Sequence, residues 1–224
     1  MTLKLNGSSS GSVSIDAPAS TAGGADRTLT LPDKTATMSP RMVLEQFYCP
    51  CDGSTITTSN GDITITDKDD VQDLTTSYAD IVGSSIAYNP PTGTTQVIYE
   101  YSFTGGRQDV TPLIHLKFFI DSDEVTDARY TQSGDVMEGR WTFKWGINIG
   151  GSAVTATGRL ASWSSAKTLK LQVREYGSSN EGKLNETYKH DGSTSSVFHR
   201  PHIGITAIGY HYEYSKNNEY YPRE

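Results

Sequence analysis

The sequence predicts an all-β protein in three parts: a strand-rich N-terminal arm over residues 1–40, a short junction over residues 41–75, and a C-terminal β-sandwich over residues 76–224. The composition favours strands and turns, with 13 Tyr and 21 Gly among 224 residues. Short runs of alternating apolar and polar residues recur, with turn residues between them. Aromatic and β-branched residues become frequent from Thr75 onward, and all three Trp lie in this part.

The arm contains three short alternating runs, around Leu3, Val13 and Leu29, joined by turns rich in Ser, Gly and Ala. Strands this short and this poor in large apolar side chains bury too little surface to be stable alone. We therefore expect the arm to pair with other chains. Three copies around an axis would remove the exposed strand edges, although another symmetry would do so equally well. The assembly residues that we expect in the arm are Val13, Ile15, Leu29 and Leu31.

The junction begins with a segment, residues 41–47, that fits either one or two helical turns or a strand. Ser39 can serve as an N-cap and Pro40 is tolerated in a first helical turn, but the segment is short. The run Ser59-Asn60-Gly61-Asp62 then predicts a hairpin turn between strands over residues 54–58 and 63–66. Asn-Gly is the reason, because both residues readily take positive φ.

Seven strands are predicted in the C-terminal part. The side chains of Val97, Tyr99 and Phe103 fall on one face of their strand, and those of Leu169 and Leu171 on one face of another. Short strands of this number and spacing are typical of a β-sandwich, here of jelly-roll type. The predicted strands cover residues 86–88, 96–103, 113–120, 124–132, 138–149, 168–176 and 204–214.

Charge and hydropathy exclude several classes of protein. The net charge of −7 argues against a general nucleic-acid binder, which needs a positive face for phosphates. No apolar run is long enough to predict a membrane span, and the N-terminus lacks the pattern of a signal peptide. Cys49 and Cys51 are too close for an unstrained disulfide and lack further zinc ligands, so we expect free thiols; a bridge between identical chains is the alternative.

Several segments resemble virion structural proteins of bacteriophages, in particular tail fibres of the marine and cyanobacterial type. In the arm these are Gly11-Ser12-Val13-Ser14-Ile15-Asp16-Ala17-Pro18-Ala19 and Asp26-Arg27-Thr28-Leu29-Thr30-Leu31-Pro32. In the junction they are Val43-Leu44-Glu45-Gln46-Phe47 and Pro50-Cys51-Asp52-Gly53-Ser54. In the distal part they are residues 91–100 and 161–171, including Ala161-Ser162-Trp163-Ser164-Ser165.

The resemblance implies a homotrimeric tail fibre that is assembled in the host cytoplasm and located in the virion tail. Residues 1–40 would dock to a tail protein, and the distal sandwich would contact a host surface glycan or protein receptor. The resemblance supplies no catalytic residues, and we expect neither an enzyme nor a cofactor or metal. Two alternatives remain: a capsid decoration or head-fibre protein, and a small polysaccharide-degrading enzyme.

Candidate receptor-binding residues are the C-terminal tyrosines. An aromatic face next to polar groups can stack against sugar rings. Packing of the same side chains on a neighbouring subunit or on the sheet core explains the pattern too, and is the favoured interpretation. The candidates are Tyr210, Tyr212, Tyr214, Tyr220 and Tyr221.

Other groups of residues have simpler interpretations. Trp141, Trp145 and Trp163 are expected in the core. Asp121, Asp123 and Glu124 form an acidic cluster beside a turn, but do not match a calcium-binding loop and are expected to be solvated. His190, His199 and His202 could form a metal-binding or pH-sensitive patch across a trimer axis, although ordinary loop histidines are favoured.

The arm gives a first prediction. Because residues 1–40 cannot bury a core alone, we expect them to be ordered only in the assembled particle, so protease digestion of the free protein cuts there first. Mass spectrometry of a digestion time course should show early loss of this segment and a persistent fragment that contains residues 76–224. Early cuts within residues 76–224 would contradict the prediction.

Overall fold

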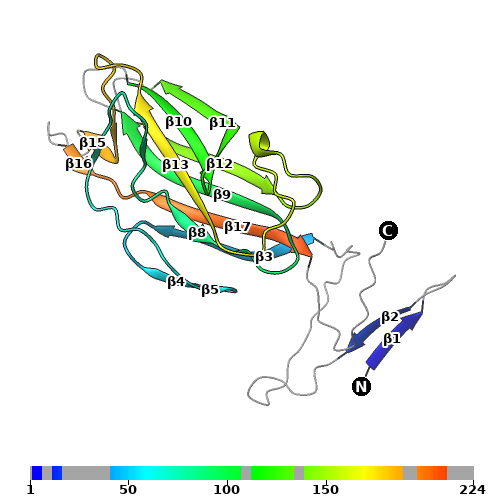
Figure 1. Ribbon diagram of the computed structural model, residues 1–224. Coiled ribbons are helices and arrows are strands. Elements are labelled where there is room, and N and C mark those ends of the chain that lie inside the picture. Colours follow the sequence, from blue (N-terminus) through cyan, green and yellow to red (C-terminus); the bar gives the residue numbers. More distant parts are fainter. Residues whose placement is uncertain are drawn as a thin grey trace. The chain divides into compact units, whose positions relative to one another are not determined.

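The computed structural model describes residues 2–6, 12–16, 41–106, 112–133, 139–188 and 196–210 (Figure 1). The chain divides into two compact units, Met1–Met38 and Ser39–Glu224. In the first unit, strand β1 (Thr2–Asn6) pairs antiparallel with β2 (Ser12–Asp16). The run predicted around Leu29 lies outside the described residues.

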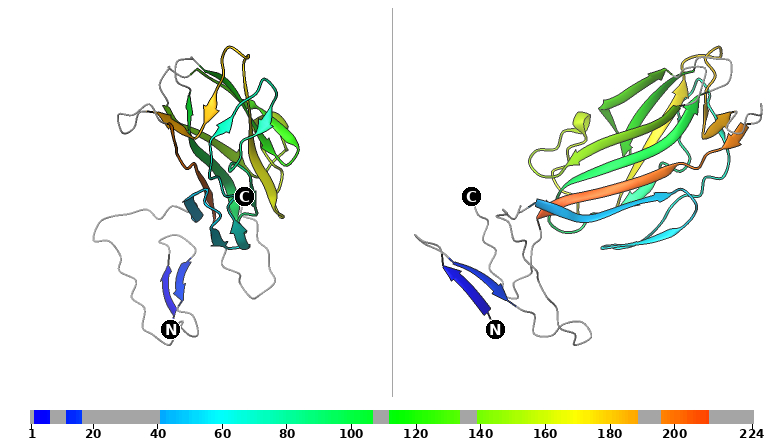
Figure 2. Two further views of the ribbon diagram at one scale, coloured as in Figure 1. Left: turned by 90° about the vertical axis from the view of Figure 1, so that its left-hand side faces the viewer. Right: turned by 180° about the vertical axis from the view of Figure 1, so that it is seen from behind.

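The second unit is a sandwich of two antiparallel sheets (Figures 1 and 2). One sheet contains β3 (Arg41–Pro50), β17 (His202–Tyr210), β9 (Thr94–Gly106) and β12 (Gly139–Asn148), extended at the end of β9 by β14 (Lys183–Leu184) and β6 (Gln72–Asp73). The other contains β11 (Asp123–Ser133), β10 (Leu113–Ile120) and β13 (Lys167–Glu175), with β7 (Ala79–Asp80) and β8 (Ile86–Tyr88) on the far side of β13. Smaller elements are the ribbons β4 (Thr55–Thr58)–β5 (Gly61–Thr64) and β15 (Glu186–Tyr188)–β16 (Ser196–Phe198), and the 3-10 helix η2 (Thr155–Thr157).

The strand order is that of a jelly roll. The main strands, taken in chain order, are β3, β8, β9, β10, β11, β12, β13 and β17, and they form four nested antiparallel pairs: β3 with β17, β8 with β13, β9 with β12, and β10 with β11. The outermost and third pairs lie in one sheet, and the second and innermost pairs in the other. Nested pairs folded over in this way give the double Greek key of a jelly roll, and the predicted fold class is confirmed.

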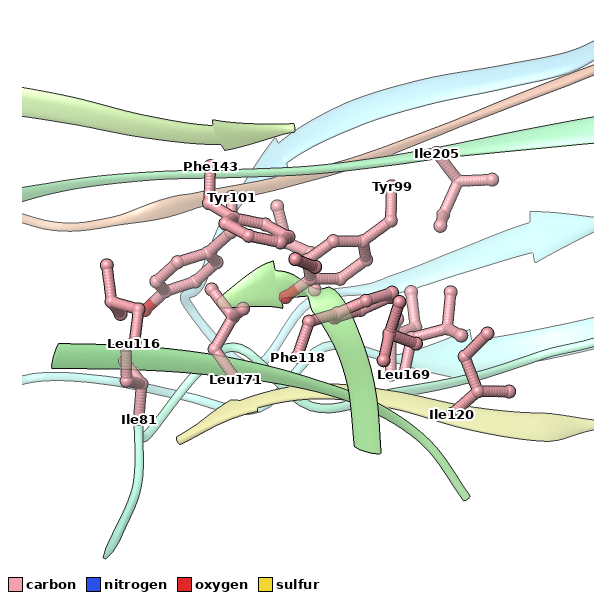
Figure 3. Close-up of a cluster of buried hydrophobic side chains, with 14 of the residues drawn as sticks. Ile81, Tyr99, Tyr101, Leu116, Phe118, Ile120, Phe143, Leu169, Leu171 and Ile205 are labelled. Carbon is pink, nitrogen blue, oxygen red and sulfur yellow. The ribbon is translucent and has the colours of Figure 1, made fainter. Parts of the chain in front are cut away.

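Strict alternation of apolar and polar residues produces the core. In β10 every second side chain is buried, namely those of Ile114, Leu116, Phe118 and Ile120. The facing strand β9 buries Val97, Tyr99, Tyr101 and Phe103. Figure 3 shows Tyr99 and Tyr101 of β9 and Leu116, Phe118 and Ile120 of β10 lying between the two layers. Tyr99 stacks on Phe118 with ring centroids 5.2 Å apart. Side chains from two sheets that interdigitate in this way form the usual sandwich core.

The hydroxyl of Tyr99 ties the two sheets to a connecting loop. It is fully buried and donates a hydrogen bond to the carbonyl oxygen of Ser84, 2.6 Å away. The Ser84 hydroxyl donates to Ile81 O and accepts from the Leu171 N–H of β13. Burial raises the pKa of Tyr99 well above its ordinary value, so the group remains a neutral donor.

Residues 41–75, which the sequence separated as a junction, belong to the same unit as the sandwich. Of the two alternatives for residues 41–47, the structure has the strand: β3 pairs with β17 from Arg41 to Pro50. Phe47 and Cys49 pack against the core, which explains why a short amphipathic segment is extended here. Its partner strand is about 160 residues away in sequence, so no local pattern could reveal the pairing.

The predicted hairpin is present as β4 and β5, but its turn differs from the expected one. Thr58 pairs with Gly61, and only Gly61 of the Asn-Gly pair has positive φ, at 115°. The Asn60 amide instead donates to the carbonyl oxygens of Asn89 and Pro90, at 3.1 and 2.8 Å. The side chain of Asn60 thus anchors the hairpin tip to the sandwich.

The aromatic contact between the sheets gives a stability prediction. Phe118→Ala removes a fully buried ring and should lower the free energy of unfolding by about 3–5 kcal/mol. The neighbouring Phe119 is only half-buried on the opposite face of β10, where Lys170 lies 5.9 Å from its ring centre. Phe119→Ala is the matched control and should cost about 1 kcal/mol. Urea denaturation measures both, and equal losses would contradict the assigned core.

Candidate binding groove

The structure places few of the predicted site residues in a described environment. Val13 and Ile15 lie in β2, paired with Leu5 and Leu3 of β1. Tyr210 ends β17, paired with Arg41. The other predicted site residues, Leu29, Leu31, Tyr212, Tyr214, Tyr220 and Tyr221, lie outside the described residues. The proposed aromatic face therefore stays a prediction.

A groove that sequence reasoning missed lies between the two sheets. Among the described strands, β11 pairs with β10 alone and β12 with β9 alone, so both are edge strands of the described sheets. Their side chains line a groove of about 490 Å³, with Phe103, Leu116 and Phe143 from the core also in its wall. Ligand sites in proteins span about 300–1,000 Å³, so the volume of this groove admits a small ligand.

The tryptophans of β12 point inward but are incompletely covered. Phe143 and Ile147, on the same face of the strand, are buried, whereas Trp141 and Trp145 are only half-buried. The Trp141 ring lies edge-on to Phe103, at 5.7 Å between centroids, and over Gly105, where it leaves no room for a Cβ atom. Trp141 and Trp145 thus pack against the core on one side, as expected, and the other side of each ring is exposed in the groove. Trp163 is buried, and its indole N–H donates to Tyr88 O.

The opposite wall comes from β11. Tyr130 pairs with the buried Leu116 and so belongs to the inner face of its strand, yet 51% of it is exposed. Its hydroxyl donates to Gln132 Oε1 at 2.5 Å, and Gln132 Nε2 donates to Ser133 O at 3.2 Å. These bonds fix both side chains along the strand.

The segment around η2 closes part of the same sandwich edge. Trp145 Nε1 donates to Thr157 O at 3.1 Å. Gly158, with φ of 73°, lies against Ile120 and Val125. Gly takes this backbone conformation without strain, and a Cβ atom here would lie 3.2 Å from Ile120 and from Val125, which is tighter than ordinary contact. The groove is therefore the part of the edge that η2 leaves open.

Most charges at the groove are paired. Arg129 contacts Glu124 at 2.7 Å, and Lys144 contacts Glu100 at 3.0 Å. The hydrogen bond from Arg129 lowers the pKa of Glu124. Arg140 Nε donates to Ser102 Oγ at 3.2 Å, and no described residue forms an ion pair with it. Asp127 has no hydrogen-bond or ion-pair partner among the described residues, so its carboxylate is available to a ligand.

The acidic and histidine clusters named from the sequence have structural partners. The Asp121 carboxylate accepts from Lys167 Nζ and from the backbone N–H of Thr168, which lowers its pKa. His202 stacks on Tyr48 at 5.4 Å, and His199 donates its backbone N–H to Asn185 O. Within the described ranges, no group of three or more His, Cys, Asp or Glu side chains is arranged to hold a metal ion.

A second polar region surrounds Thr104 of β9. Asn185 is fully buried at φ of 63°, and neither atom of its amide has a hydrogen-bond partner among the described residues. Glu186 Oε2 and one ring nitrogen each of His199 and His202 are also buried without a partner in that part of the chain. Burial, followed by the charges of Arg140 and His202, lowers the pKa of His199. Such groups cost free energy unless water or a ligand satisfies them.

No family model matches the chain, and no curated protein matches it. Solved structures with similarity include the infectious bursal disease virus VP2 subviral particle, with 11% identity over 89% of this chain and a TM-score of 0.33. The particle of the Gx strain of that virus has 9% identity over 83% of this chain and the same TM-score. The chain spans about half of those chains, 50% and 46% respectively. Both TM-scores lie below 0.5, so the fold assignment rests on the strand order.

The two cysteines are free thiols in different environments. Cys51 is fully buried, and its Sγ donates to Gly83 O at 3.4 Å. Burial, then the nearby Cys49, raises the pKa of Cys51 to about 12. Cys49 is half-buried, and its pKa is also raised by burial.

This difference predicts selective alkylation. At pH 8 only about one Cys51 in ten thousand is a thiolate, because the pKa lies far above the pH, and burial also blocks access. In the folded protein, iodoacetamide should modify Cys49 before Cys51, and Cys51 should react only on unfolding. Mass spectrometry of Cys49→Ser and Cys51→Ser variants measures each thiol separately. Equal rates for the two thiols would refute the burial of Cys51.

Proposed function

We propose that the chain is a virion structural protein, namely a homotrimeric tail fibre. Residues 1–40 dock to the tail, and the jelly roll contacts a host surface glycan or protein receptor. The protein is located in the virion tail after assembly in the host cytoplasm, and it acts by binding rather than catalysis. The likeness of the arm, junction and distal segments to phage tail fibres supports this proposal.

One observation carries the proposal: the chain divides into a small unit, Met1–Met38, and a large unit, Ser39–Glu224. The first unit contains a ribbon of two five-residue strands, β1 and β2. A two-stranded ribbon is at best marginally stable alone in water. The second unit has two sheets around a core of buried aromatic and aliphatic side chains. This division suits a protein with an attachment end and a stable distal end.

A capsid decoration or head-fibre role is the second candidate. The jelly-roll topology favours it, because viral capsid domains and lectins share this topology. Topology alone does not choose between them, since one fold supports many functions. Among described groove residues, Asp127 is the only carboxylate, whereas glycoside hydrolysis ordinarily uses a pair. No observation therefore favours the polysaccharide-degrading alternative.

The trimer prediction is tested by solution mass. Light scattering of the full chain should give three times its 24.4 kDa mass. Because the arm is expected to be ordered only in the assembled particle, the double variant Val13→Asp, Ile15→Asp should leave this mass unchanged and should reduce the amount of the chain found in purified particles. The matched control, Ser12→Asp with Ser14→Asp, places the same charges at the intervening positions and should be incorporated like the unsubstituted chain. A monomeric unsubstituted chain would refute the fibre.

Location in the particle separates the two candidates. Gold-labelled antibodies raised against the whole chain should mark the tails of intact phage particles in electron micrographs. Label on the head alone would reject the tail fibre in favour of a decoration or head fibre. Unlabelled particles, with the protein present only in the infected cell, would reject both.

A further inference from the structure

We propose that the groove between β11 and β12 is a saccharide-binding site for a short, uncharged oligosaccharide. This inference deepens the proposed function, because it names the class of receptor, and it moves the contact from the C-terminal tyrosines to another part of the molecule. All of the described residues that line the groove belong to the second unit.

Aromatic surface is the first argument. Tyr130 from one sheet and Trp141 and Trp145 from the other line the groove, and all three retain exposed area although they belong to inward-facing positions. Ordinary core positions would bury such rings. Sugar rings carry apolar C–H faces that stack on aromatic rings, and their hydroxyls bond to polar groups around the stack. Two aromatic walls suit a flat, hydroxyl-rich ring better than they suit an ion.

Polar groups at the rim are the second argument. Asp127 can accept hydrogen bonds from hydroxyls, and Gln132 Nε2 keeps a second hydrogen for donation beyond its bond to Ser133 O. Trp141 Nε1 has no partner among the described residues. The groove therefore offers the acceptor oxygens of Asp127 and the donors of Gln132 and Trp141 beside its aromatic rings.

Charge is the third argument, and it selects an uncharged sugar. Of the three cationic residues in the lining, Arg129 and Lys144 are paired with Glu124 and Glu100. Arg140 lies with Lys144 on the outer face of β12, where its Nε donates to Ser102, so neither cation faces the aromatic rings. Among the charged residues described in the lining, Asp127 then remains for a ligand, and its carboxylate repels a uronic acid.

Rigidity is the fourth argument. Tyr130 is hydrogen-bonded to Gln132, and Trp145 is hydrogen-bonded to Thr157. The Trp141 ring packs edge-on against Phe103 and lies directly over Gly105. Side chains that are fixed before the ligand arrives lose little conformational entropy on binding. A strand from another protein would instead pair with the free backbone edges of β11 or β12, and would not depend on the Tyr130 ring.

The experiment uses the full chain and isothermal titration with four trisaccharides: maltotriose, mannotriose, a galactotriose and trigalacturonic acid. At least one uncharged trisaccharide should bind. Tyr130→Ala and Asp127→Asn should each weaken that affinity by about tenfold, because one removes the stacking ring and the other a charged acceptor. Both substituted residues are exposed, so the fold should survive.

Tyr176→Ala is the matched control, because Tyr176 is 61% exposed and does not line the groove. Its affinity should equal that of the unsubstituted chain. Failure of all four sugars to bind, binding of trigalacturonic acid alone, or equal weakening by Tyr176→Ala would each overturn the proposal. A monomer that binds sugar through Tyr130 would reject the trimeric fibre and support the saccharide site. A trimer that binds none of the sugars would support the fibre and reject the saccharide site.

Discussion

The fold depends on one buried contact, in which the Tyr99 ring stacks on Phe118 while its hydroxyl bonds to Ser84. The ring joins the two sheets at 5.2 Å, and the hydroxyl joins them to the loop between β7 and β8. The hydroxyl of Tyr101, two residues along, donates to Val82 O in the same loop. A purely apolar core would hold the sheets together without fixing this loop. The two buried hydroxyls specify it, because each would be costly to leave without a partner.

Both open sides of the sandwich are covered by inserted segments, and they are covered to different extents. At the β3 side, the β4–β5 hairpin packs Ile56 and Ile63 against the core, and Ser59 bonds to Glu45. At the opposite side, the η2 segment covers Ile120 and Val125 but leaves part of the edge open. The groove thus arises from an incomplete cover rather than from a gap in the core, which keeps its floor of Phe103, Leu116 and Phe143 intact.

Local patterns were sufficient for most strands and insufficient for the site. The run at 113–120 was predicted with the bounds that β10 has, because every second residue is a large apolar one. Residues 41–47 remained ambiguous, since their strand is defined by pairing with β17 at the other end of the chain. Asn60-Gly61 predicted a turn correctly, but the pattern did not show that the Asn60 amide donates hydrogen bonds to carbonyl oxygens of a distant loop.

The groove shows the same limit. Trp141, Trp145 and Tyr130 were visible as strand residues, but their exposure follows from β11 and β12 being edge strands of opposite sheets. Edge position is a property of topology, and the spacing of aromatic residues along one strand does not encode it. The sequence could therefore identify inward-facing rings but could not show that two of the strands carrying them lie beside solvent.

The nesting of the strand pairs also determines how long each strand waits for its partner during translation. The outermost pair joins β3 to β17, and the hydrogen bond between Gln46 and Thr206 spans 160 residues. At ordinary translation speeds a ribosome needs roughly 10–30 s to make that length of chain. Throughout this interval β3 has left the ribosome without its partner strand, and an unpaired apolar edge is the part of a nascent β-protein most exposed to aggregation.

The innermost pair, β10 with β11, needs only a two-residue turn at Asp121 and Ser122. Among the main strands of the sandwich, β3 is therefore the first to be made and the one whose partner is made last, so chaperone protection matters most for β3.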